Sequence, residues 1–372
     1  MLRQYLTGLL IVGRSRTGVT RFVSKVRGGQ QRSGDRTSHG SVKWKKWTPL
    51  PVGVGFAYIA YQQYGHVRER EEIKLGVVRE TKPFKPWQVA LYTWLPLRLE
   101  SRVWGWLSRL ELPIFLRQPL IGLFARTYNC DLSEATEEDL TKYPSMNEFF
   151  RRKIKPELRP VAKDCLVSPA DGLVQVCGRL CDECIEQVKG YSYSLDAFVG
   201  ADLADKLRNR KKKSPDNQFY YCVIYLSPAD CHRFYSPAKW DIGHRRHITG
   251  YLLGVNSKVV SKVPHLFTIN ERVLLSGEWD YGFFSMTPVG ATHVGSILID
   301  CEPTLKTNSP YKRIGDMDDK PYESAIKKQA GDFIGEFNMG SSVVLIFEAP
   351  KSFEFAKKPG DKLKYGQSLG RL

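Results

Sequence analysis

Near the C-terminus, residues 336–347 have the sequence EFNMGSSVVLIF. The run of large branched and aromatic residues from Val343 to Phe347 predicts a buried β-strand, and Gly340-Ser341-Ser342 leads into it. Glycine takes strained turns without a Cβ clash, so a sharp bend is expected just before the strand. The simplest interpretation of Gly-Ser-Ser at this place is a hairpin turn.

A second interpretation of the same residues is chemical. A hydroxyl directly after such a glycine can turn back on the preceding carbonyl, so that Ser341 Oγ attacks the Gly340 carbonyl carbon. This N-to-O acyl shift converts the amide into an ester, and β-elimination of the ester would release the upstream chain. The dehydroalanine left at position 341 would hydrolyse to ammonia and an N-terminal pyruvoyl group. Other residues must decide between the two interpretations.

Length and charge narrow the class of protein. The chain has 372 residues, enough for one large domain or two with a sizeable core. Of the net charge of +17, residues 1–46 supply +10, because they hold eleven Lys or Arg and a single acid, Asp35. The remainder is mildly basic, which suits anionic lipid at least as well as nucleic acid. No recognised nucleic-acid motif is present, so we expect no nucleic-acid partner.

Three segments are predicted before the main domain. Residues 1–46 are rich in Arg, Ser and Gly, with an apolar face near the start, which is typical of a mitochondrial transit peptide; a disordered basic tail is the alternative. Residues 47–64 have an uncharged, aromatic-flanked stretch that predicts a single membrane anchor, although it is short and contains prolines; an interfacial helix is the alternative. Residues 65–86 are a polar linker.

Residues 87–157 have helical, amphipathic periodicity. Apolar side chains recur at threes and fours among Arg98, Arg102 and Arg109; they are Trp94, Leu95, Leu99, Val103, Trp106, Leu107 and Leu110. A second such run covers residues 114–128, and Ser145 is expected to cap a short helical turn. A helix with Trp and Leu on one face and Arg on the other can lie on an anionic membrane, whereas in the alternative this face packs on the domain.

From about residue 158 to residue 372 the pattern changes to short alternating runs broken by Gly and Pro. We therefore predict an α+β protein whose catalytic domain is β-rich and antiparallel, a sandwich or barrel with a few helices. Residues 206–213 are expected to be a basic surface loop. Cys181 and Cys184 have CxxC spacing, but no second pair with ligand spacing follows, so no zinc site is predicted.

Three clusters in this domain could carry chemistry. Asp171 ends the turn motif Ser168-Pro-Ala-Asp-Gly, where its simplest role is an Asx turn. His232 follows an apolar strand in the sequence LSPADCHRFYSP (residues 226–237), where it could equally be a satisfied structural histidine. Gly340-Ser341 is the third. Ser, His and Asp from separate loops are the ingredients of hydroxyl activation, in which a base takes the proton and a carboxylate orients the base.

With these clusters in order, the chain resembles the phosphatidylserine decarboxylase proenzymes, and closely the mitochondrial form. The resemblance runs from about Trp94 to Leu372. Its motifs are residues 168–172, 186–190 with 193–195, 226–228 to 232–234, 270–273, 289–292 with 294–297, and 335–350. So many ordered motifs in one chain make the resemblance specific.

The resemblance implies a self-processing carboxy-lyase. The family's cleavage motif, usually Leu-Gly-Ser-Thr, is Met339-Gly340-Ser341-Ser342 here. Cleavage between Gly340 and Ser341 would give a β chain ending at 340 and an α chain of residues 341–372. Ser341 would become a covalent pyruvoyl cofactor, whose ketone forms a Schiff base with phosphatidylserine and accepts electrons as CO₂ leaves, so that phosphatidylethanolamine results.

The resemblance also implies the surroundings of the enzyme. No metal or pyridoxal phosphate is needed. The two chains would form an α/β heterodimer, with a further homo-oligomer left open. The catalytic domain would face the intermembrane space from the mitochondrial inner membrane.

One departure from the family concerns self-cleavage. The family's triad matches Asp171, Ser341 and a histidine three positions after His232, where this chain has Tyr235; the histidine matching His232 is attributed to decarboxylation. A phenol is a poor base at pH 7. Three hypotheses follow: His232 serves both steps, His244 or His247 reaches the site, or maturation is slow or absent. In the last case the chain would be an inactive lipid-binding paralogue on the same fold.

Overall fold

The computed structural model describes residues 83–180, 184–188, 191–213, 216–293, 296–338 and 341–372. The predicted transit peptide, the predicted anchor and most of the predicted linker lie outside these ranges, as does Cys181. Within the described ranges, every helix is too short or too polar to cross a membrane.

The strand predicted from residues 343–347 is β13 (Ser342–Pro350), and it lies inside an antiparallel sheet of eight strands. The strand order is β11-β7-β8-β9-β13-β5-β2-β15. The other seven strands are β2 (Gly172–Arg179), β5 (Asn217–Tyr225), β7 (Trp240–Ile248), β8 (Arg272–Trp279), β9 (Gly282–Val289), β11 (Met317–Lys328) and β15 (Lys362–Leu363). The prediction of a β-rich antiparallel domain is confirmed to that extent, but the sheet is open, with β11 and β15 at its edges.

Smaller sheets flank the large one. Strands β10 (Ile297–Ile299), β12 (Phe333–Phe337) and β6 (Arg233–Tyr235) form one sheet in that order, and β1 (Leu166–Val167), β16 (Ser368–Arg371) and β14 (Glu354–Phe355) form another. β3 (Cys184–Val188) pairs with β4 (Tyr191–Ser194). Short helices connect these strands: α7 (Leu195–Val199), α9 (Ser257–Val260) and α10 (Leu266–Ile269).

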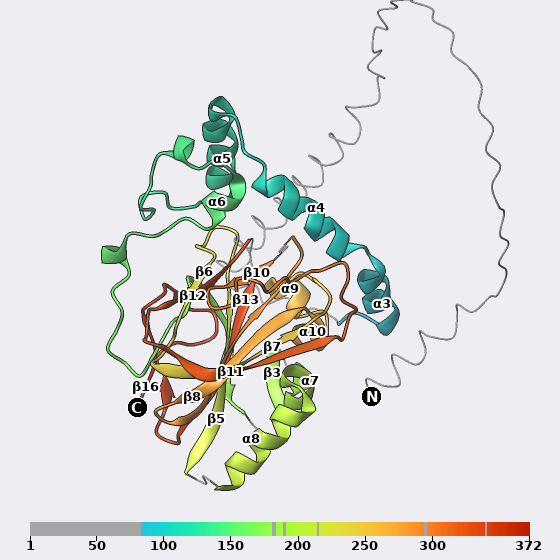
Figure 1. The fold of residues 1–372 in the computed structure, drawn as a ribbon, viewed down its shortest axis with the longest axis vertical. Helices are drawn as coiled ribbons and strands as arrows, with labels where there is room; N and C mark the ends of the chain where they lie inside the picture. The colour runs from blue at the N-terminus through green and yellow to red at the C-terminus, as the bar shows by residue number, and fades with distance from the viewer. Residues whose placement is uncertain (1–82, 181–183, 189–190, 214–215, 294–295, 339–340) are drawn as a thin grey trace, which may run out of the picture. The chain divides into compact units, whose positions relative to one another are not determined.

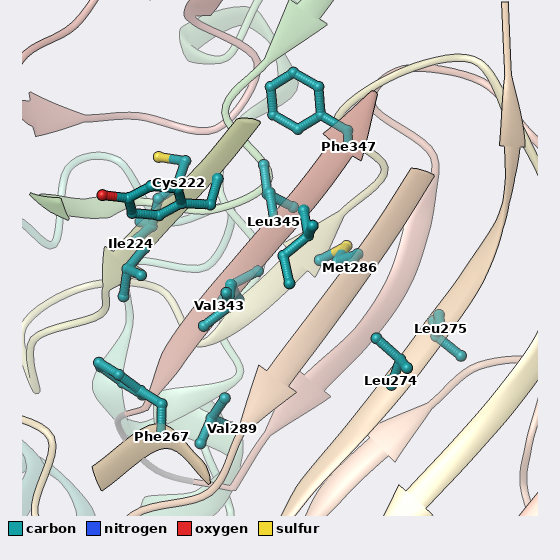
Figure 2. Close-up of a cluster of buried hydrophobic side chains, with 14 of the residues drawn as sticks. Cys222, Ile224, Phe267, Leu274, Leu275, Met286, Val289, Val343, Leu345 and Phe347 are labelled. Atoms are coloured by element: carbon teal, nitrogen blue, oxygen red, sulfur yellow. The ribbon is translucent and has the colours of Figure 1, made fainter. Parts of the chain in front are cut away.

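The core lies on both faces of β13, because every residue of this strand except Pro350 is buried. Figure 2 shows Val343, Leu345 and Phe347 of β13 beside side chains of the two neighbouring strands, with Ile224 on β5 and Met286 on β9. A strand buried on both faces should read as a continuous apolar run, which explains why the sequence identified it.

The amphipathic run forms α3 (Pro86–Trp94), α4 (Leu97–Arg109) and α5 (Ile114–Tyr128), and α6 (Met146–Phe150) follows. Ser145 accepts a hydrogen bond from the Glu148 N–H at 3.3 Å, so the predicted cap is confirmed. Figure 1 shows α5, with α4 beside it, and α8 (Ala201–Lys213) on opposite sides of the unit that contains the large sheet, within the residues that the structure describes. The prediction of a basic loop at 206–213 was wrong. These residues form the second half of α8, because Lys and Arg are good helix formers.

Candidate active site

One end of the large sheet collects the chain segments that carry the candidate residues. Register places Leu173, Tyr225, Ser342, Val289, Arg272 and Ile248 in one row across six adjacent strands. Asp171 precedes β2, the segment 226–232 follows β5, and Ser341 precedes β13. Three sequence motifs far apart in the chain therefore meet at this end of the sheet.

Ser341 is buried and held on two sides. Its hydroxyl donates a hydrogen bond to the carbonyl of Val289, the last residue of β9. Its own carbonyl accepts a hydrogen bond from the Leu226 N–H at 2.8 Å. The neighbouring Ser342 hydroxyl is also buried, and it has no hydrogen-bond partner among the described residues. Position 341 is thus fixed by the two strands beside β13.

The segment 226–232 is hydrogen-bonded on both sides of the Met339-Gly340 pair. On the downstream side, Leu226 donates to the Ser341 carbonyl. On the upstream side, the Phe337 N–H donates to the carbonyl of His232 at 2.9 Å. Since Phe337 ends β12 and Ser341 begins the approach to β13, His232 is fixed beside the same short connection that contains the predicted cleavage site.

The His232 ring is fully buried, and neither ring nitrogen has a hydrogen-bond partner among the described residues. Its ring meets that of Phe150 edge-on, with centroids 5.6 Å apart. Burial, reinforced by the nearby positive charge of Arg152, lowers the pKa of His232 to about 3. The imidazole is therefore neutral at pH 7. The interpretation of a satisfied structural histidine does not fit a buried ring with both nitrogens unpaired.

Asp171 is a buried ion-pair residue rather than a simple Asx-turn residue. Its carboxylate lies 2.8 Å from Arg159 Nη2 and 3.6 Å from Lys364 Nζ, and it accepts a hydrogen bond from the Tyr365 N–H at 2.8 Å. Arg159 also contacts Glu134 at 2.6 Å. β5 lies between β2 and β13, so the starts of these two strands are two strand spacings of about 4.8 Å apart. The backbone near Asp171 is therefore about 10 Å from the backbone near Ser341.

Tyr235 is stacked on Tyr365. Their ring centroids are 4.1 Å apart, with an interplanar angle of 17°, and Phe333 packs edge-on against Tyr235. The Tyr235 N–H donates to the Pro169 carbonyl at 2.8 Å, two residues before Asp171. The structure thus brings Tyr235 close to Asp171. Burial raises the pKa of Tyr235, so its phenol stays protonated at neutral pH.

His244 and His247 lie on β7, away from Ser341. β7 is separated from β13 by β8 and β9, so three strand spacings, about 14 Å, lie between them. Both side chains already have acidic neighbours: His247 Nε2 is 2.8 Å from Glu271 Oε1, and His244 Nε2 is 3.5 Å from Asp319 Oδ1. The register gives no support to the hypothesis that either histidine acts on Ser341.

Several residues of this site could not be found from the sequence. The Val289 carbonyl is a backbone group, so side-chain motifs carry no signal for it. Arg159 and Tyr365 contact Asp171 only through the fold, and Tyr365 lies far from Asp171 in the sequence, so no local motif connects them. Arg152 lies in the basic pair that follows α6, and its guanidinium is buried against the Ala229 carbonyl at 2.8 Å.

Comparison with known proteins agrees with the geometry. Residues 146–371 match the family model described as phosphatidylserine decarboxylase. The chain is 43% identical over 342 residues to a Cricetulus griseus protein named phosphatidylserine decarboxylase proenzyme, mitochondrial, covering 87% of this chain and 84% of that protein. It is 41% identical over 329 residues to a Caenorhabditis elegans protein of the same name, covering 88% of this chain and 83% of that protein.

A more distant relative supports the same assignment. A Schizosaccharomyces pombe protein named phosphatidylserine decarboxylase proenzyme 1, mitochondrial, is 36% identical over 394 residues, covering 86% of this chain and 89% of that protein.

Proposed function

The chain belongs to the phosphatidylserine decarboxylase family of carboxy-lyases, and from this premise we propose that it cuts itself between Gly340 and Ser341 and then converts phosphatidylserine to phosphatidylethanolamine and CO₂. One observation carries the proposal. The segment 226–232 is hydrogen-bonded to Phe337 on one side of the cleavage motif and to Ser341 on the other, so it holds His232 beside that motif.

His232 serves both steps in this proposal. At pH 7 its buried ring is neutral, with an available lone pair and no partner among the described residues. It takes the Ser341 hydroxyl proton during cleavage, once that hydroxyl leaves the Val289 carbonyl. Later the same ring exchanges a proton with the substrate. Tyr235 cannot replace it as a base, because burial raises the pKa of the phenol.

The site fits a pyruvoyl group at position 341. The position is fully buried, and two backbone groups hold it, the Val289 carbonyl and the Leu226 N–H. The Leu226 N–H would continue to hold the carbonyl that residue 341 contributes to the chain. Once formed, the group supplies a ketone that withdraws electrons from the bond to the departing carboxylate. The His232 ring is fully buried against Phe150, which shields this proton carrier from bulk water.

The helices before the catalytic domain suit a lipid substrate. α4 exposes Leu99, Val103, Trp106 and Leu107, while Ser101, Gly105 and Ser108 face the protein. A phospholipid keeps its acyl chains in the bilayer, so the site must lie at the membrane surface, and this exposed face can rest there. The relatives are named mitochondrial, which supports a mitochondrial location. We propose further, as the family resemblance implies, that the chain lies at the inner membrane with its catalytic domain on the intermembrane-space side.

The first experiment is the intact mass of the C-terminal fragment of the purified chain, together with CO₂ release from phosphatidylserine. A fragment of residues 341–372 with a pyruvoyl terminus, plus CO₂, is the expected result. An uncut chain with an ordinary Ser341 would contradict it. Protease protection of the catalytic domain in intact mitoplasts would contradict the assigned side of the membrane.

The Tyr235–Tyr365 stack favours a second candidate function. If maturation needs a base at position 235, the chain is a lipid-binding paralogue that stays uncut. Such a protein would bind phosphatidylserine vesicles and release no CO₂, which the same measurements distinguish.

A further inference from the structure

The connection between β10 and β11, together with the first residue of β11, presents large apolar side chains to solvent. Tyr311 is 93% exposed, and Ile314 and Met317 are 47% and 58% exposed. The backbone around them is fixed: Gly315 N–H donates to the Thr249 carbonyl at 2.8 Å, and Thr249 N–H donates to the Asp316 carbonyl at 2.9 Å. Three large apolar side chains exposed within seven residues of hydrogen-bonded backbone favour a surface for a partner.

This connection is clamped to α4. Arg98 Nη2 donates to the Ser309 carbonyl at 2.9 Å, and Arg102 Nη1 donates to the Asn308 carbonyl at 3.4 Å. In return, Asn308 Nδ2 donates to the Arg98 carbonyl at 3.1 Å. Asn308 is itself anchored, because its N–H donates to the buried Glu271 carboxylate at 2.7 Å. Residues 309–317 are named here the 309–317 loop. The start of this loop is therefore bound to α4.

The clamp lies at the edge of the exposed apolar stripe of α4. At about 100° per residue, Arg98 and Arg102 project about a quarter turn from the centre of the stripe formed by Leu99, Val103 and Trp106. Side chains at that angle lie level with the boundary between an apolar surface and water. Figure 1 shows the chain between β10 and β11 passing α4, in agreement with these hydrogen bonds.

We propose that the 309–317 loop is a second membrane-contacting element, which places Tyr311 and Ile314 among the headgroups of an anionic phospholipid bilayer beside α4. The inference rests on the proposed function, because a lipid substrate requires the site to lie at a bilayer. Charge supports this occupant: Lys312 is paired with Asp318 at 2.8 Å, but Lys306 and Arg313 also accompany the apolar side chains, so residues 306–318 keep a positive balance with Asp316 counted, and a phosphatidylserine headgroup is anionic. Tyrosine is also suited to the headgroup region.

Hydrogen exchange of the full chain tests the proposal. Peptides covering 309–317 and 97–109 are compared with no vesicles, with phosphatidylcholine vesicles and with vesicles that also contain phosphatidylserine. We expect exchange in 309–317 to slow on the phosphatidylserine vesicles. The double substitution Tyr311→Ser, Ile314→Ser should lower the vesicle-induced protection of 309–317 roughly tenfold. Leu158→Ser, Leu372→Ser is the control, because it removes two apolar side chains outside the loop that are 45% and 49% exposed, close to the 47% of Ile314.

Two further outcomes decide the case. Arg313→Gln should weaken protection about fivefold on phosphatidylserine vesicles and leave it unchanged on phosphatidylcholine alone. Equal exchange of 309–317 with and without vesicles, while 97–109 is protected, overturns the proposal. Fragment mass and CO₂ release are followed in parallel: normal cleavage and turnover with an unprotected loop defeats this inference alone, whereas an uncut chain with a protected loop defeats only the proposed function.

Discussion

The aromatic rings of Tyr235 and Tyr365 are stacked, with centroids 4.1 Å apart, and the backbone N–H of Tyr365 donates to Asp171 at 2.8 Å. The sequence resemblance implies that Asp171 and Tyr235 occupy two positions of a self-cleavage triad, and the fold brings the backbone of Tyr235 to Pro169, two residues before Asp171. Partial burial raises the pKa of the Tyr235 phenol, so it stays protonated and cannot act as a base at neutral pH. The Tyr235–Tyr365 stack therefore occupies the position where the resemblance implies a histidine base, but it cannot accept the proton.

Substituting Tyr235 tests what this replacement costs. If His232 serves both steps as proposed, Tyr235→His should leave the rate at which the 341–372 fragment forms nearly unchanged. An acceleration of roughly tenfold or more would instead show that maturation is slow for want of a base at position 235, because an imidazole there can accept a proton at pH 7. Tyr235→Phe should leave the rate unchanged, since it keeps the ring and removes only a phenol that stays protonated. The time course of the fragment after synthesis measures both. An unchanged rate in Tyr235→His would mean that Tyr235 imposes no handicap.

Two adjacent serines allow a matched test of the nucleophile. Ser341→Ala should leave a single uncut chain, because it removes the attacking hydroxyl. Ser342→Ala should still be cut, and its stability should be equal or slightly higher, because it removes a buried hydroxyl that has no partner among the described residues. Gel mobility and intact mass distinguish the chains. Loss of cleavage in Ser342→Ala would show that Ser341 is the wrong choice of nucleophile.

Much of the site could be predicted because its residues are marked by local sequence. β13 is buried on both faces and so reads as an unbroken apolar run, and Ser145 caps α6 as its spacing indicates. Asp171, His232 and Ser341 each follow or precede such a strand, and antiparallel pairing brings these ends to one side of the sheet. Local patterns thus located the candidate residues correctly relative to the strands.

The rest depends on contacts between distant segments. The ion pair between Asp171 and Arg159, the stack on Tyr365 and the Val289 carbonyl acceptor are set by tertiary packing, which no single stretch encodes. The distance of His247 from Ser341 also required the strand order, because its nearness to His232 in sequence suggested otherwise. Residues 206–213 were misread because solvation explained their charge without using their high helix propensity.

The buried carboxylate of Asp171 should be a major stabilising group. Asp171→Asn keeps an acceptor for the Tyr365 N–H but removes the charge that faces Arg159. Breaking one side of a buried ion pair should lower the free energy of unfolding by about 3 kcal/mol. Glu134→Gln, which alters the more exposed partner of Arg159, should cost about 1 kcal/mol or less. Urea unfolding of uncut chains (Ser341→Ala background) measures both; equal losses would contradict the ranking.

His232 should make the folded chain sensitive to acid. Its pKa is about 3 in the folded protein and near 6.5 when exposed, so between these values the unfolded chain binds a proton that the folded chain does not. The free energy of unfolding should therefore fall as pH drops below about 6.5, by up to about 1.4 kcal/mol per pH unit from this group. Above about pH 7 the group should contribute no pH dependence, because it is neutral in both states.

Replacement of the ring isolates this contribution. In a Ser341→Ala background, which keeps the chain in one piece, His232→Leu should flatten the slope between about pH 4.5 and about pH 6.5. It should not lower stability at neutral pH, because the lost nitrogens have no partners among the described residues. His265→Asn is the control: His265 is exposed, and asparagine tolerates its left-handed backbone at φ 59°. An equal slope in His232→Leu and its parent would show that the buried imidazole is not the acid-sensitive group.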